Sequence, residues 1–161
     1  MKTIFLFAIA LAILTNLKAQ RTFTWEDTIR GSITPARAWW DLKHYDLRIT
    51  AMPETKTIIG QVTIRYKVIA PYQILQIDLQ APLTIEKVIQ DGAELNYNRH
   101  GDNAYLIDLK KPQQIKKSES ITVYYKGQPK EARNPPWQGG VQWTTDNDGN
   151  PFIATSCQGL G

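Results

Sequence analysis

The sequence predicts an all-β fold, an open sandwich of antiparallel strands. Five runs alternate apolar and polar residues with a period of two, at positions 45–49, 62–68, 75–79, 105–109 and 121–125. Such alternation places one face of each strand on a core and the other face in water. Gly, Pro, Asn and Asp gather between the runs, where their backbone preferences favour turns. No amphipathic stretch of convincing helical length interrupts this pattern.

The first 19 residues have the layout of a secretory signal peptide. Lys2 precedes an unbroken apolar run from Ile4 to Leu14, and Ala19 provides a small residue at the expected cleavage point. The run is shorter than the roughly 20 residues that span a bilayer, so an uncleaved N-terminal membrane anchor is the less favoured alternative. We therefore expect an exported chain that is periplasmic, cell-surface or secreted, with no integral membrane segment after cleavage.

The exported part divides into a short lead-in and a β domain. Residues 20–38 show no clear period and are interrupted by Gly31 and Pro35, which predicts an irregular lead-in. We expect the β domain to occupy residues 39–161 and to be incomplete at its C-terminal end. Near that end, a cluster of turn-forming residues at positions 146–150 predicts a hairpin in which Trp143 and Phe152 meet across the strands.

Composition and charge exclude several classes of function. The 161 residues carry 19 Lys and Arg against 15 Asp and Glu, and this net charge of +4 is too small and too dispersed for a nucleic-acid-binding protein. The single cysteine, Cys157, excludes an internal disulfide framework, and its apolar surroundings predict a buried, inert thiol. His44 and His100 are the only two imidazoles, and each is expected to be packed or solvated rather than to bind a metal.

Five segments carry motifs in a recognisable order. Positions 41–47, 59–64, 75–79 and 123–129 each hold a strand motif, and positions 139–161 add a longer motif that ends in Thr-Ser-Cys-Gln-Gly-Leu-Gly. Together they resemble the N-terminal domain of the M1 family of zinc metallopeptidases, the gluzincin aminopeptidases that also include leukotriene A4 hydrolase. The resemblance implies a saddle-like, open antiparallel β domain.

The resemblance also implies an activity, which would belong to the full-length protein. M1 enzymes bind zinc through a His-Glu-x-x-His helix and a later Glu, and the metal activates a water molecule. This chain has neither that motif nor the family's Gly-x-Met-Glu-Asn motif. We therefore expect no catalytic residue and no metal ligand here, and an inactive chain in isolation. It would supply one wall of the substrate cleft and pack against a catalytic domain that binds zinc and cleaves N-terminal residues from peptides.

One residue of the longer motif is implied to bind substrate. Gln158 stands where the family carries a Gln or Glu that holds the substrate's free amino group. A neutral amide accepts a hydrogen bond from an ammonium group without the cost of burying a further carboxylate. The alternative is a structural Gln158 that satisfies backbone groups near the end of a strand.

A stand-alone secreted β-sandwich that binds carbohydrate or protein is the alternative function. Trp39, Trp40, Trp137 and Trp143 are its candidate ligand platform, because aromatic faces bind sugars and cations. Packing in a core or between domains is the commoner use of such side chains and is preferred. The cluster at positions 146–150 superficially resembles a calcium loop but lacks its distal Glu, so a plain turn is preferred there as well.

Overall fold

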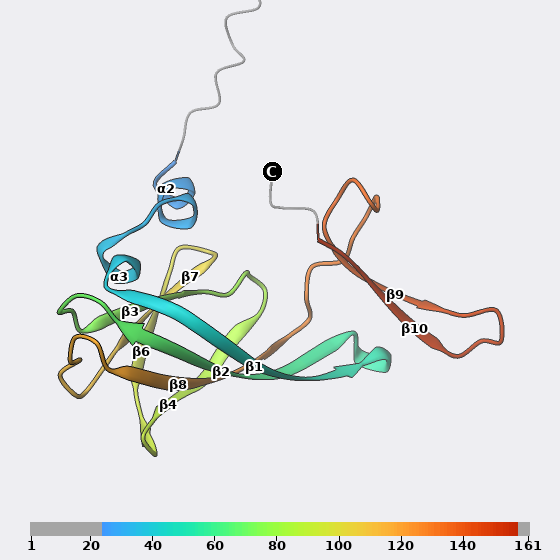
Figure 1. The fold of residues 1–161 in the computed structure, drawn as a ribbon. Coiled ribbons are helices and arrows are strands. Elements are labelled where there is room, and N and C mark those ends of the chain that lie inside the picture. The colour runs from blue at the N-terminus through green and yellow to red at the C-terminus, as the bar shows by residue number, and fades with distance from the viewer. Residues whose placement is uncertain (1–23, 158–161) are drawn as a thin grey trace, which may run out of the picture.

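The computed structural model describes residues 24–157, and β-strands dominate it (Figure 1). The two longest strands, β1 (Trp40–Met52) and β2 (Thr57–Val68), form an antiparallel hairpin that turns through the short 3-10 helix η2 (Pro53–Thr55). They belong to a five-stranded sheet of order β1-β2-β8-β4-β5. The other three strands of this sheet are β8 (Ser118–Gly127), β4 (Thr84–Gln90) and β5 (Ala93–Glu94). All its pairings are antiparallel.

A smaller sheet covers part of the large one. It has three short antiparallel strands in the order β3-β7-β6, formed by β3 (Ile74–Asp78), β7 (Ala104–Asp108) and β6 (Asn96–His100). Buried side chains of both sheets form one core cluster, which includes Tyr66, Leu75, Val88, Ile107 and Val123. The predicted all-β, open antiparallel architecture is therefore confirmed.

A third, two-stranded sheet stands apart from the other two (Figure 1). Strands β9 (Gly140–Thr145) and β10 (Pro151–Ser156) form the predicted hairpin, but Trp143 lies opposite Ile153, not Phe152. In the turn between β9 and β10, Asp146 Oδ1 accepts hydrogen bonds from the backbone N–H groups of Asp148 (3.0 Å) and Asn150 (2.8 Å). These bonds, led by the one from Asn150, lower the pKa of the Asp146 carboxyl. The carboxylate thus helps to close the turn.

The segment predicted to be an irregular lead-in contains two short helices, so that prediction was wrong for its described part. Helix α2 (Trp25–Gly31) begins with a capping box between Thr24 and Asp27, and α3 (Pro35–Ala38) follows. Helices this short are unstable alone, and contacts with β3 hold them. Gln76 Nε2 donates to the carbonyl oxygen of Ile29 (3.3 Å), and Arg37 pairs with Asp78. Within residues 24–157, no helix is long and apolar enough to span a membrane.

The two larger sheets differ greatly in length. Strands β1 and β2 have 13 and 12 residues, whereas β3 and β7 have five each, so the long pair extends about 40 Å against about 17 Å for the short sheet. The uncovered half of β1 exposes Tyr45, Leu47 and Ile49 by 51%, 55% and 52%. The prediction that this strand buries its apolar face was therefore wrong, because the second sheet ends before reaching it.

Candidate functional site

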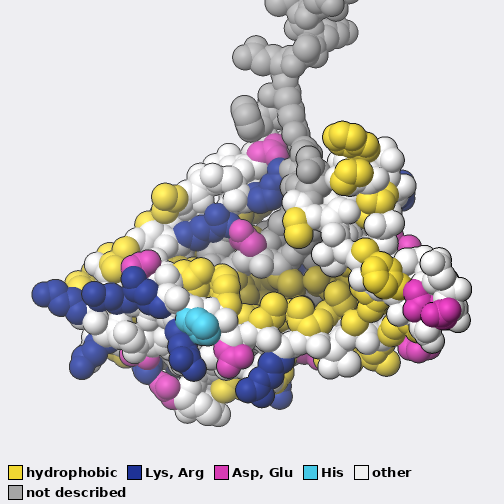
Figure 2. Space-filling view, turned by 45° about the vertical axis from the view of Figure 1, so that its right-hand side comes forward, with side chains coloured by type: hydrophobic (Ala, Val, Ile, Leu, Met, Phe, Trp, Pro, Cys, Tyr) yellow, Lys and Arg dark blue, Asp and Glu magenta, His cyan; other side chains and the backbone are white. Residues whose placement is uncertain are grey.

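The uncovered half of the long sheet forms an apolar groove. Its volume is about 310 Å³, and strands β1, β2, β3 and β8 contribute its lining, namely Tyr45, Leu47, Val62, Ile64, Ile77, Asp78, Leu79, Val123 and Tyr125. We call this surface the open face. A band of hydrophobic side chains crosses the molecule in Figure 2. Exposed apolar patches of this kind mark surfaces that bind another protein or ligand.

The open face is electrically neutral. Its one charged lining residue, Asp78, pairs with Arg37 and also accepts a hydrogen bond from Gln76 Nε2 at 3.3 Å. Burial raises the pKa of the Tyr45 phenol, and the Asp78 carboxylate raises it further. Burial likewise raises the pKa of Tyr125. Both phenols are therefore protonated at neutral pH, and the face is suited to packing against an apolar surface.

A glycine shapes the floor of this groove. Gly60 on β2 lies opposite Tyr125 on β8, and a Cβ atom at Gly60 would overlap the Tyr125 ring. The absence of a side chain lets the ring cover the sheet at this point. Gly60 belongs to one of the strand motifs that carry the family resemblance, so the structure supplies a physical reason for that motif.

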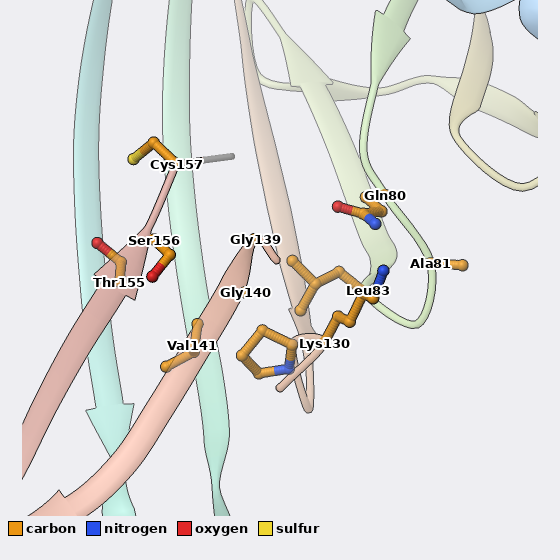
Figure 3. Close-up of a pocket in the computed structure, with 11 residues that line it drawn as sticks. Gln80, Ala81, Leu83, Lys130, Gly139, Gly140, Val141, Thr155, Ser156 and Cys157 are labelled. Carbon is orange, nitrogen blue, oxygen red and sulfur yellow. The ribbon is translucent and has the colours of Figure 1, made fainter. Parts of the chain in front are cut away.

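A second pocket lies at the base of the β9–β10 hairpin and has a volume of about 380 Å³ (Figure 3). We call it the basal pocket. Gly140, with φ of 145°, begins the hairpin there, and a Cβ atom would lie 2.6 Å from Ala132 N and from Lys130 O. Backbone bonds fasten the hairpin at the same point: Val141 N donates to Lys130 O (2.9 Å), and Ala132 N donates to Val141 O (3.1 Å). Gly140, the second glycine of the long motif, therefore permits this close approach.

The predicted substrate residue, Gln158, lies outside the described residues. The residue before it, Cys157, lines the basal pocket and is exposed, so the prediction of a buried thiol was wrong. Strand β10 ends at Ser156, and Cys157 lies beyond its last pair with β9. The last described residue before Gln158 therefore lines the basal pocket. Gln80 and Lys130, which also line it, were not singled out from the sequence, because no periodic signal links two positions so far apart.

The described residues do not fit a zinc site. His44 lies on β1 of the large sheet, whereas His100 lies on β6 of the small sheet and meets the Trp25 ring edge-on, with centroids 4.4 Å apart. Between residues 24 and 157, no three His, Cys, Asp or Glu side chains come together as a metal would need.

Two of the four tryptophans considered as a ligand platform pack within the fold, which is the role preferred for them from the sequence. Trp39 is buried, donates from Nε1 to Ile74 O (2.7 Å) and meets Tyr66 edge-to-face at 5.8 Å. Trp40 donates from Nε1 to Ala36 O at 3.1 Å, which ties α3 to the first strand. Trp137 is 75% exposed, and the buried Nε1 of Trp143 has no acceptor among the described residues.

The fold resembles that of M1 zinc metallopeptidases of known structure. A mutant M1 zinc metallopeptidase from Deinococcus radiodurans bound to a Tyr-Ser-Ala substrate matches with a TM-score of 0.53 and 19% identity, over 71% of this chain and 28% of that one. A two-domain M1 zinc metallopeptidase mutant bound to L-arginine gives 0.56 and 19%, over 76% and 28%. Yeast LTA4 hydrolase gives 0.54 and 16%, over 71% and 18%. No protein-family model and no curated protein matches the sequence.

These matches confirm at the level of fold the resemblance to the N-terminal domain of the M1 family. The chain spans less than a third of the length of each of these enzymes.

Proposed function

We propose that this chain is the N-terminal β domain of an exported M1-type zinc aminopeptidase. Its role would be to pack against a catalytic domain and to form one wall of the cleft in which peptides lose their N-terminal residues. Zinc would be bound by the catalytic domain, where it supplies a Lewis acid for peptide hydrolysis. The proposal combines the fold, which the M1 enzymes share, with the signal-like N-terminus.

The open face is the observation that carries this proposal. Leu47 and Ile49 are more than half exposed on a face where the alternation of the strand calls for burial. Covering such side chains would contribute about 25 cal/mol for each Å² of apolar surface removed from water. A second apolar surface is therefore the natural occupant of the groove, and the neutral pairing of Asp78 with Arg37 leaves no free charge to oppose it.

We assign substrate binding to Gln158. Its side-chain oxygen would accept a hydrogen bond from the free amino group of the peptide. In the full-length enzyme, Gln158→Ala is expected to raise KM about tenfold, because an ammonium hydrogen bond of this kind contributes about 1.4 kcal/mol. Steady-state kinetics and zinc analysis of the same preparation check this, since zinc content should stay at the wild-type level. Unaltered kinetics would contradict the assignment.

The native protein provides the test of the whole proposal. It can be captured from its source with an antibody to residues 24–157 and measured for intact mass, zinc content and release of amino acids from a tripeptide. We expect a mass far above 18.3 kDa, about one zinc per molecule and release that a chelator abolishes. The 161-residue chain produced alone should bind no stoichiometric zinc and release no amino acid.

Two results would overturn the proposal. One is chelator-sensitive peptidase activity in the 161-residue chain alone, which would place the catalytic groups within it. The other is a native mass that matches residues 20–161, since no catalytic domain would then be present. The second result would favour a secreted binding module, in which Trp137 would be the first side chain to test for carbohydrate binding.

A further inference from the structure

We propose that the protein self-associates through the free edge of β1, which pairs in antiparallel fashion with β1 of a second copy. Within the described residues, β1 is the outer strand of the large sheet and pairs only with β2 (Figure 1). In an antiparallel sheet, every second residue of an outer strand directs its N–H and C=O groups away from the neighbouring strand. These unpaired groups form a template for a further strand.

The edge of β1 is long and poorly protected. The strand has 13 residues, whereas strands in globular proteins usually have about five or six. Proteins commonly protect an edge with a proline, a lysine or a β-bulge. In β1 the bulge lies between Leu42 and His44, and the one lysine is Lys43. From His44 to Met52 the strand carries none of these three features, so this stretch is open to pairing.

Two opposite charges on β1 point to a second copy as the partner. Asp46 and Arg48 are two positions apart, so their side chains lie on the same face of the strand. Neither forms an ion pair with another described residue. In an antiparallel pairing of two copies centred on Leu47, Asp46 of each copy faces Arg48 of the other. Both charges are then paired across the strands, and opposite-charge pairs of this kind stabilise a sheet.

The same two charges select the register. Residues that face each other across an antiparallel pair lie on the same side of the sheet, so a two-fold pairing of identical strands is centred on a residue that faces its own copy. A centre at Asp46 or at Arg48 would place two like charges directly opposite each other, which destabilises a sheet. Leu47 lies between them, and no other centre brings Asp46 opposite Arg48.

The apolar face of β1 supports this register. Tyr45, Leu47 and Ile49 are each more than half exposed. With the centre at Leu47, Tyr45 faces Ile49 of the other copy, and Leu47 faces its own counterpart. An aromatic side chain opposite a β-branched one is a favourable cross-strand pair. The pairing therefore joins complementary side chains on both faces of the strand and removes apolar surface from water.

Self-association at this edge goes beyond the proposed function and does not depend on it. Edge pairing engages backbone groups at the side of the sheet, whereas the proposed catalytic domain would pack on the open face. Because the two-fold pairing keeps the apolar residues of both copies on one side, it would join their open faces into one continuous apolar surface.

Charge reversal in the full-length protein tests the pairing. Sedimentation velocity over a series of protein concentrations should show a reversible dimer for the wild type. Asp46→Arg and Arg48→Asp each place like charges at both cross-strand pairs. Each should raise the dimer dissociation constant about thirtyfold, which corresponds to about 2 kcal/mol. The matched control is Lys110→Asp, in the loop after β7, which should leave the dissociation constant unchanged.

Mixing the two variants separates charge pairing from a loss of folding. In a complex of Asp46→Arg with Arg48→Asp, every facing pair at these positions is again opposite in charge. An equimolar mixture should therefore dimerise as strongly as the wild type, and this recovery would also show that both variants are folded. None of these measurements requires peptidase activity, so they decide the inference whether or not the proposed function holds.

Three results would overturn self-association through β1. One is a full-length protein that stays monomeric throughout the concentration series. In such a monomer, slow hydrogen exchange at every successive amide from His44 to Met52 would show that another segment of the same protein occupies the edge. The second is a dimer that neither charge reversal weakens, and the third is a pair of weakened variants whose mixture does not recover. Both of these would place the contact elsewhere on the molecule.

Discussion

Replacing Gly140 by alanine is expected to lower the local stability of the β9–β10 hairpin by about 3 kcal/mol and to detach it from the segment at positions 130–132. The φ of 145° at Gly140 disfavours any side chain. The added Cβ would also meet Ala132 N and Lys130 O at 2.6 Å, and these are backbone atoms that cannot rotate away. Hydrogen exchange at the amides of Ala132 and Val141 measures the effect, because both amides bridge this junction.

The matched control is Gly31→Ala. A Cβ at Gly31 meets no atom within 4 Å, so this variant should leave exchange at Ala132 and Val141 unchanged. Wild-type protection of Val141 in Gly140→Ala would show that the hairpin is held by other contacts.

Tyr66→Phe is expected to lower the free energy of unfolding by about 2 kcal/mol at neutral pH. The Tyr66 hydroxyl donates to Gln113 Oε1 (2.9 Å) and accepts from Gln90 Nε2 (3.2 Å), and all three side chains are buried. Phenylalanine would leave two buried amide groups without this partner. Urea unfolding measures the loss. The control is Tyr72→Phe, because the half-exposed Tyr72 hydroxyl makes no hydrogen bond to another described residue.

The same hydroxyl predicts an alkaline instability. Burial raises the pKa of Tyr66 to about 12 from its ordinary value of 10.0. Because the folded state holds the proton more tightly, this contribution to stability is fully present below pH 10 and is lost as the pH rises from 10 to about 12. Wild-type stability should therefore fall more steeply than that of Tyr66→Phe over this interval. Parallel curves for the two proteins would contradict the prediction.

The strand pattern predicted the fold where burial follows the period of two. It missed β4 because a β-bulge between Ile85 and Lys87 shifts the register, so that Ile85, Val88 and Gln90 are the buried residues and do not alternate. It missed β6 because that strand, Asn96–His100, is mostly polar. This segment forms a strand because it pairs with β7. Its own residues do not indicate that pairing.

The candidate site was predictable only where a motif marks it. Alternation in β1 identified Tyr45, Leu47 and Ile49 as residues on one face of the strand. Whether that face is buried depends on the length of the smaller sheet, which the sequence of β1 does not indicate. The motif around Gln158 points to a substrate role through family resemblance. Lys130 and Gln80 have no such signal, because only the folded chain brings their two loops to the same pocket at the base of the hairpin.

A sheet that extends past its cover also implies an order of local unfolding. Near the Trp40 end of β1 and the Val68 end of β2, the strands share the core with Leu75 and Ile107. Toward Met52 and Thr57 they have no buried core residue, and strand pairing and exposed polar contacts such as the Lys56–Glu131 ion pair hold them. Regions with few buried contacts open with a small free energy. A surface that covers this end would therefore act first on the lifetime of the β1–β2 tip. The tip would change from the most transient part of the long strands into one as durable as the core.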